Sequence, residues 1–230
     1  IPPLIIGLTV VAYGTSAPEM SVSVMSALSA EGADIAIGNV VGSNICNVLL
    51  ILGLSALIAP LGVTKQMIRS DVPIMIGVSF LLLLFSLDGQ LSKVDSIILF
   101  IGGVTYTLSL IYQSSKQSVE HDKFTEEYSL SEPVTLIAWV KNGVYIIGGL
   151  VLLVLGSRWL VASAITIAEY FQVSKLIVGL TIVAVGTSLP ELFTSVIASY
   201  RGETEIAVGN VLGSNIFNIL AVLGVSGIVA

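Results

Sequence analysis

Long runs without a charged residue constrain this fold more than any other feature of the sequence. Residues 35–64 contain no Asp, Glu, Lys or Arg, and residues 96–115 form a second uncharged run. A helix of about 20 apolar residues spans the hydrocarbon core of a bilayer, so each run is long enough to cross a membrane. Charged residues make up 10% of the chain, whereas about 25% is typical of soluble domains. We therefore predict an all-α, polytopic membrane protein.

Apolar stretches predict seven membrane segments, separated by short connections. They are residues 4–30, 35–59, 72–87, 94–113, 143–168, 174–201 and 206–230. One plainly polar connection, residues 114–134, divides the chain into a first half, 1–113, and a second half, 135–230.

The two halves contain an internal duplication. Residues 4–32 align with 176–204 at 15 of 29 positions, and 35–59 align with 206–230 at 15 of 25, after a single-residue gap. The two copies are five segments apart, an odd number, so they must face opposite ways in the membrane. Inverted repeats with discontinuous helices place a binding site near the bilayer midplane. The repeat unit also predicts one span before the first copy and two after the second, which makes ten in a complete protein against seven here.

Loop charges set the expected orientation. On one side of the membrane, the predicted connections and the helix end at residue 201 together hold six basic residues. The connections on the other side hold only Lys93 and Lys175. Basic residues concentrate in cytoplasmic loops. We therefore expect the 114–134 loop to be cytoplasmic. No basic cluster indicates nucleic-acid binding.

A Gly-Thr-Ser-x-Pro-Glu motif occurs once in each copy, at residues 14–19 and 186–191. The proline removes a helical amide donor, which frees backbone carbonyls near Thr15 and Thr187 to bind a cation. Glu19 follows Thr15 by four residues, so the two are expected on one helix face. Acidic residues within a membrane segment usually mark an ion path. Two carboxylates with neutral oxygens suit Ca²⁺, whereas soft metals would prefer Cys or His.

A second motif, Gly-Asn-Val-x-Gly-Ser-Asn-Ile-x-Asn, also occurs twice. Its polar residues repeat every four positions, which places each set along one helix face beside the glutamates. The sets are Asn39, Ser43 and Asn47, and Asn210, Ser214 and Asn218. The small-xxx-small glycines predict close helix contacts, and we expect Asn44 and Asn215 to form interhelical hydrogen bonds.

These paired motifs resemble the α-repeats of the cation/Ca²⁺ exchanger superfamily, and in particular its Na⁺/Ca²⁺ exchanger branch. The resemblance implies Ca²⁺ ligands at Glu19, Glu191, Thr15 and Thr187. It implies Na⁺ ligands at Ala12, Ser16, Ser43, Asn47, Ala184, Ser188, Ser214 and Asn218. K⁺-dependent relatives have Asp where this chain has Asn218, which argues against K⁺ dependence. The short central loop is similar to that of prokaryotic members, which implies a protein of the prokaryotic plasma (inner) membrane.

The expected function is antiport of Ca²⁺ against Na⁺ by alternating access, with no enzymatic reaction and no cofactor beyond the transported ions. An H⁺/Ca²⁺ exchanger is the nearest alternative, with Glu19 and Glu191 as proton carriers. A cation channel is a further alternative, which predicts flux without a counter-ion. An intramembrane hydrolase is disfavoured because the sole histidine, His121, lies in the polar loop and the membrane segments offer no aspartyl pair.

Overall fold

The computed structural model describes residues 7–29, 33–120 and 136–230, and every regular element in these ranges is a helix. The first repeat contains two spans with irregular turns and a helical hairpin. Its elements are η1 (Gly7–Val11), α2 (Ala12–Thr15), α3 (Ala17–Ala27), α4 (Ala33–Cys46), η2 (Asn47–Ile51), α5 (Leu52–Ile58), η3 (Met67–Asp71), α6 (Val72–Phe85), η4 (Ser86–Asp88) and α7 (Lys93–Glu120).

The second repeat begins with one long helix and then follows the order of the first. Its elements are α8 (Leu136–Phe171), α9 (Lys175–Val178), η6 (Gly179–Val183), α10 (Ala184–Thr187), α11 (Leu189–Tyr200), α12 (Thr204–Phe217), η7 (Asn218–Leu223) and α13 (Gly224–Val229). The π-helical turns η1 and η6 occupy equivalent places in the two copies, as do η2 and η7.

Four helices in the described residues are long and apolar enough to span a membrane, and a fifth span is bent. The straight ones are Ala33–Ile58, Met67–Asp88, Lys93–Tyr112 and Thr204–Val229, and the bent pair joins Lys175–Thr187 to Leu189–Tyr200 at 45°. These confirm five of the predicted segments. The predicted segment 4–30 is helical but interrupted at Ser16, and 143–168 lies within α8.

Two of the boundaries that differ from the prediction belong to the hairpin of α6 and α7. The span predicted to begin at 72 begins at Met67, because the π-helical turn η3 continues directly into α6, although it contains Arg69 and Asp71. The helix predicted to end at 113 continues as α7 to Glu120, since the polar residues that follow tolerate a helix equally well. The remainder of the predicted loop, residues 121–134, lies outside the described residues.

The two repeats interlock through their glycines. A Cβ on Gly42 of α4 would lie 2.3 Å from the Leu180 carbonyl oxygen of η6, and one on Gly213 of α12 would lie 2.7 Å from the Leu8 carbonyl oxygen of η1. The second helix of each repeat therefore packs directly on the first helix of the other. Such backbone contact is what small-xxx-small patterns permit.

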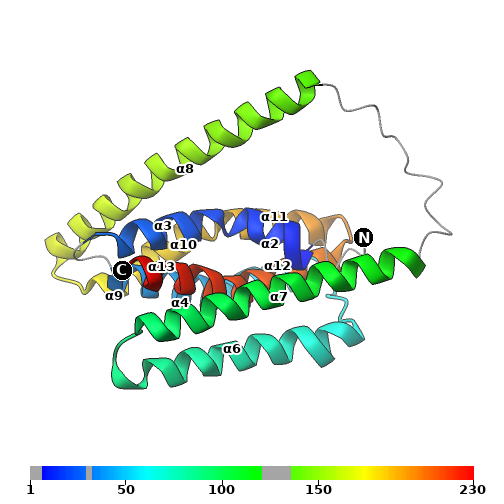
Figure 1. Ribbon diagram of the computed structural model, residues 1–230, viewed down its shortest axis with the longest axis horizontal. Coiled ribbons are helices and arrows are strands. Elements are labelled where there is room, and N and C mark those ends of the chain that lie inside the picture. Colours follow the sequence, from blue (N-terminus) through cyan, green and yellow to red (C-terminus); the bar gives the residue numbers. More distant parts are fainter. Residues whose placement is uncertain (1–6, 30–32, 121–135) are drawn as a thin grey trace.

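The hairpin of α6 and α7 and the long helix α8 lie on opposite sides of this interlocked core (Figure 1). Leu99 of α7 packs with Ile219 and Val222 of η7 in one hydrophobic cluster. In α8, Val161 and Ala164 near its C-terminal end pack with Val22 of α3. The N-terminal half of α8 slopes away from the bundle in Figure 1.

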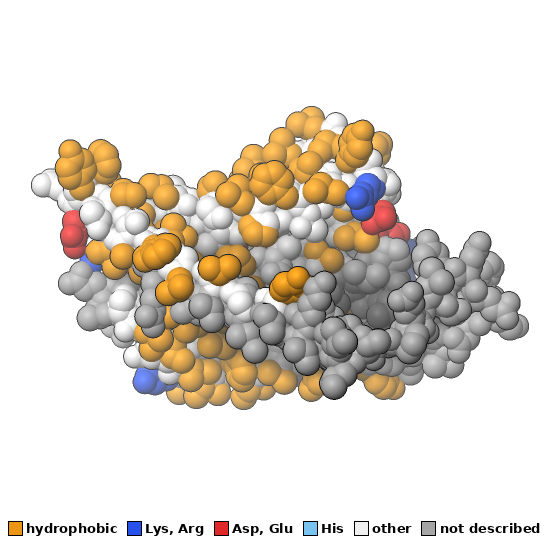
Figure 2. All heavy atoms as spheres, turned by 90° about the horizontal axis from the view of Figure 1, so that it is seen from above, with side chains coloured by type: hydrophobic (Ala, Val, Ile, Leu, Met, Phe, Trp, Pro, Cys, Tyr) orange, Lys and Arg blue, Asp and Glu red, His pale blue; other side chains and the backbone are white. Residues whose placement is uncertain are grey.

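The outer surface is apolar, as expected for helices that face lipid. Leu49 is 73% exposed and Leu57 is 84% exposed. On the face shown in Figure 2, the coloured charged side chains lie toward the two ends of the described surface, and hydrophobic side chains are spread over the area between them.

Candidate functional site

Each repeat has a helix break at the serine of its first motif. Ser16 has φ −82° and ψ 7°, and Ser188 has φ −81° and ψ 3°, so both leave the helical geometry in the same way. Pro18 and Pro190 then lie in the first turn of α3 and α11, where a missing amide hydrogen is tolerated. The prediction of discontinuous helices is confirmed, and the glutamates begin the helices that follow the breaks.

The two glutamates are fully buried, and each accepts a hydrogen bond from the other repeat. The Ser16 hydroxyl donates to Glu191 Oε1 at 2.9 Å, and the Ser188 hydroxyl donates to Glu19 Oε1 at 3.1 Å. Ser214 also lies 3.4 Å from Glu191 Oε1. The first motifs of the two repeats therefore meet in the interior, as the inverted repeat predicted.

The threonines also reach across the repeat boundary. Thr187 Oγ1 donates to Asn39 Oδ1 at 2.9 Å, and Thr15 Oγ1 donates to Asn210 Oδ1 at 3.1 Å. The motif spacing predicts Thr15 and Glu19 on one face of a helix, but the helix breaks at Ser16 between them. The Thr15 side chain consequently contacts the opposite repeat.

Two serines that the motifs did not single out hold these asparagines. Asn39 Nδ2 donates to Ser23 Oγ at 3.0 Å, and Asn210 Nδ2 donates to Ser195 Oγ at 3.0 Å. Each serine lies four residues after a motif glutamate, on the same helix face. The duplication contained this signal, because a serine stands at the same aligned position in both copies.

The other predicted site residues lie in the same buried layer. Ser43 Oγ is 3.4 Å from the Ala184 carbonyl oxygen and 3.3 Å from Thr187 Oγ1. The Ala12 and Ala184 carbonyl oxygens each accept the amide hydrogen of their motif serine at 3.0 Å. The structure thus places the alanine carbonyl oxygens that were predicted as Na⁺ ligands next to serine residues that were also predicted as Na⁺ ligands.

Asn44 and Asn215 link the second helices of the two repeats, which confirms the predicted interhelical hydrogen bonds. Asn44 Nδ2 donates to the Asn215 carbonyl oxygen at 3.1 Å and its Oδ1 accepts from Asn218 Nδ2 at 3.1 Å. Asn47 Nδ2 donates to Asn215 Oδ1 at 3.0 Å. These bonds use the amide nitrogens of Asn47 and Asn218 and leave their oxygens available.

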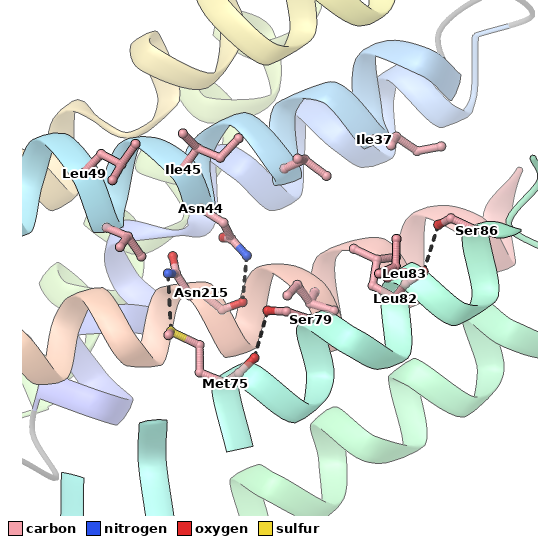
Figure 3. Close-up of a pocket in the computed structure, with 13 residues that line it drawn as sticks. Ile37, Asn44, Ile45, Leu49, Met75, Ser79, Leu82, Leu83, Ser86 and Asn215 are labelled. Carbon is pink, nitrogen blue, oxygen red and sulfur yellow. Dashed lines mark hydrogen bonds between the residues drawn. The ribbon is translucent and has the colours of Figure 1, made fainter. Parts of the chain in front are cut away.

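Figure 3 shows Asn44 and Asn215 facing one another beside a groove between α4, α6 and α12. The groove has a volume of about 560 Å³ and is lined mainly by apolar side chains, including Ile37, Leu49 and Leu82. The motif glutamates do not line it. The groove therefore borders the asparagine pair, and the glutamates belong to a separate buried layer.

Among the described residues, four buried oxygens of the predicted ligands have no hydrogen-bond partner: Glu19 Oε2, Glu191 Oε2, Asn47 Oδ1 and Asn218 Oδ1. A buried acceptor without a partner costs free energy, and coordination to a cation removes that cost. In the described ranges, no group of three or more His, Cys, Asp or Glu residues could hold a metal. The arrangement instead offers two carboxylates with amide, hydroxyl and carbonyl oxygens, which is the chemistry of hard cations.

Residues 1–114 and 141–230 match the family model described as sodium/calcium exchanger protein. The protein CaxA of Alkalimonas amylolytica is 45% identical over 100% of this chain and 71% of its own length. The sodium/calcium exchanger MaX1 of Methanosarcina acetivorans is 32% identical over 97% of this chain and 73% of its own length. A solved structure of the sodium–calcium exchanger NCX_Mj aligns with a TM-score of 0.68 at 33% identity, and covers 100% of this chain and 71% of that one.

Proposed function

Because this chain belongs to the sodium/calcium exchanger family, whose members are integral membrane cation/Ca²⁺ antiporters, we propose that it exchanges Ca²⁺ for Na⁺ at one shared site. The observation that carries the proposal is the reciprocal contact of the two motifs, in which each glutamate is bonded by the serine of the opposite repeat. One ion bound between Glu19 and Glu191 therefore joins the two halves of the molecule.

The charge of the site explains why the two ions compete. Two buried carboxylates are expensive in a low-dielectric interior unless cations neutralise them. One Ca²⁺ does so, with the carbonyl oxygens of Thr15 and Thr187 completing its shell. Na⁺ ions do so at the neighbouring oxygens of Ala12, Ser16, Ser43 and Asn47 and of their counterparts Ala184, Ser188, Ser214 and Asn218.

Alternating access is proposed to arise from movement of α8 against the core. This helix packs on α3 through residues near its C-terminal end, such as Val161 and Ala164, while Tyr145 and Leu152 are 66% and 71% exposed. Contacts made through short side chains such as Val161 and Ala164 allow a helix to slide at low cost. We place the protein in a prokaryotic plasma membrane, with the 114–134 loop on the cytoplasmic side.

An ion-gradient experiment separates the candidate counter-ions. Purified protein is reconstituted into vesicles, and Ca²⁺ uptake is followed under an outward Na⁺ gradient, an outward proton gradient, or neither. We expect uptake with the Na⁺ gradient only, and none for Glu191→Gln. Uptake driven by the proton gradient and indifferent to Na⁺ would establish the H⁺/Ca²⁺ alternative, and uptake without any counter-ion would indicate a channel.

A further inference from the structure

Among the described residues, four buried serine hydroxyls outside the glutamate layer have no hydrogen-bond partner. They belong to Ser26, Ser55, Ser199 and Ser226, whose exposed fractions are 0, 0, 2 and 3%. A serine within a membrane helix can bond the carbonyl of the preceding turn, as Ser79 does at 2.8 Å to Met75. An orphaned buried hydroxyl costs free energy and calls for a water or an ion beside it.

These hydroxyls extend two linear rows of polar residues, called files below, that each begin at one of the glutamates. On α3, Ser23 and Ser26 follow Glu19 by four and seven residues, which places all three on one helix face. Helix α13, which carries Ser226, packs on α3. The first file thus runs from Glu19 along α3 toward the start of α4.

The second file repeats this arrangement in the opposite direction. On α11, Ser195 and Ser199 follow Glu191 by four and eight residues, again on one face. Helix α5, which carries Ser55, packs on α11. Ser55 and Ser226 are aligned positions of the duplication, so the two files are related by the inverted repeat.

An acidic residue stands near the outer end of each file. A pocket of about 260 Å³ has Asp34, Gln90 and Ser226 in its lining, among apolar residues such as Leu91 and Leu223. Asp34 is exposed in the first turn of α4, and its aligned counterpart Glu205 lies in the first turn of α12. Acidic groups at a mouth raise the local concentration of cations.

We propose that the two serine files, Ser23–Ser26–Ser226 and Ser195–Ser199–Ser55, are the paths by which cations and their water reach the glutamates from opposite membrane faces. Hydroxyl oxygens replace part of an ion's hydration shell, and because they carry no charge they release the ion again. The paths rest on the proposed function only for the identity of the ions that pass. Their existence is tested by access of reagents, independently of transport.

The test uses single cysteines in a Cys46→Ser background, since Cys46 is the only cysteine of the chain. Ser226→Cys and Ser55→Cys place a thiol in the two files. Ser79→Cys places one on the exposed side of α6 as a matched control. Each variant is reconstituted and treated from one side with a membrane-impermeant cationic thiol reagent.

We expect the Ser226→Cys thiol to react only from the Asp34 side, the Ser55→Cys thiol only from the Glu205 side, and the control from neither. The cationic reagent should react about tenfold faster than a neutral one of equal size at Ser226→Cys, and Asp34→Asn should abolish that preference. Reaction of either file thiol from both sides, or no reaction at all, would overturn the proposal.

Two further comparisons keep the outcomes distinct. If Ser226→Cys does not fold, Ser26→Cys in the same file takes its place with the same expectation. Sided labelling in a protein that shows no Na⁺-driven Ca²⁺ uptake would retain the paths and reject the Na⁺ coupling. Na⁺-driven Ca²⁺ uptake in a protein without sided labelling would reject the paths and retain the Na⁺ coupling.

Discussion

Adding a single methyl group at Gly42 should separate the two repeats. The new Cβ would lie 2.3 Å from the Leu180 carbonyl oxygen and 2.7 Å from the Ala184 Cβ. Non-bonded heavy atoms are most stable at about 3.5–4.0 Å, so α4 must move by about 1 Å from η6. The obstructing oxygen belongs to the backbone, so no side chain can rotate out of the way.

The cost of Gly42→Ala follows from this displacement. Overpacking of a close-packed interior destabilises by about 1–3 kcal/mol. The same movement lengthens the 3.4 Å contact between Ser43 Oγ and the Ala184 carbonyl oxygen, so Na⁺ affinity should fall along with stability. Stability and Na⁺ affinity should therefore fall together, because the same displacement of α4 lowers both.

Gly53→Ala is the matched control, because it lies in the same span and a Cβ there meets nothing within 4 Å. Replacing a helical glycine by alanine in open space stabilises by about 0.5–1 kcal/mol. Thermal unfolding in detergent should therefore show a lower Tm for Gly42→Ala and an unchanged or higher Tm for Gly53→Ala. Equal Tm values for the two variants would refute the interlocked packing.

Four further substitutions test the buried polar residues. Ser16→Ala and Ser188→Ala each remove one hydrogen bond to a carboxylate, so both should weaken Ca²⁺ binding by about tenfold, as measured by calorimetry. A loss of Ca²⁺ affinity in only one of the two variants would contradict the equivalence of the repeats. Asn215→Ala removes the acceptor of the Asn47 amide, and the orphaned donor should lower stability by about 1–3 kcal/mol, so an unchanged Tm would argue against that bond. Asn218→Asp adds a third carboxylate, so Ca²⁺ transport in vesicles should then require an added monovalent cation. Transport that does not depend on such a cation would contradict the idea that the site must be neutralised before it can change its membrane side.

Much of this architecture could be predicted from the sequence because the duplication preserves the residues that membrane burial makes expensive. Uncharged runs located the spans, and the odd number of segments between copies gave the inverted orientation. Glu19 and Glu191 were identifiable because few acids lie in such segments. The helix breaks followed from Pro18 and Pro190, since proline removes an amide donor wherever it occurs.

The pairing of side chains could not be predicted in this way. A motif shows that Ser16 lies near a carboxylate, but only the interlocking of α4 with η6 and of α12 with η1 determines that its partner is Glu191. The supporting role of Ser23 was missed because it lies outside both motifs, although the aligned Ser195 carried the signal. The extension of α7 to Glu120 was missed because a polar sequence can continue a helix beyond the membrane.

Ca²⁺ binding to the purified protein is the most direct test of the central claim that Glu19 and Glu191 share one ion. Calorimetry at low Na⁺ should give one Ca²⁺ per chain for the native protein. Glu19→Gln and Glu191→Gln should each abolish that binding, while the control Glu203→Gln, on the exposed loop, should leave it unchanged. Retention of native Ca²⁺ affinity by either of the first two variants would contradict the shared site.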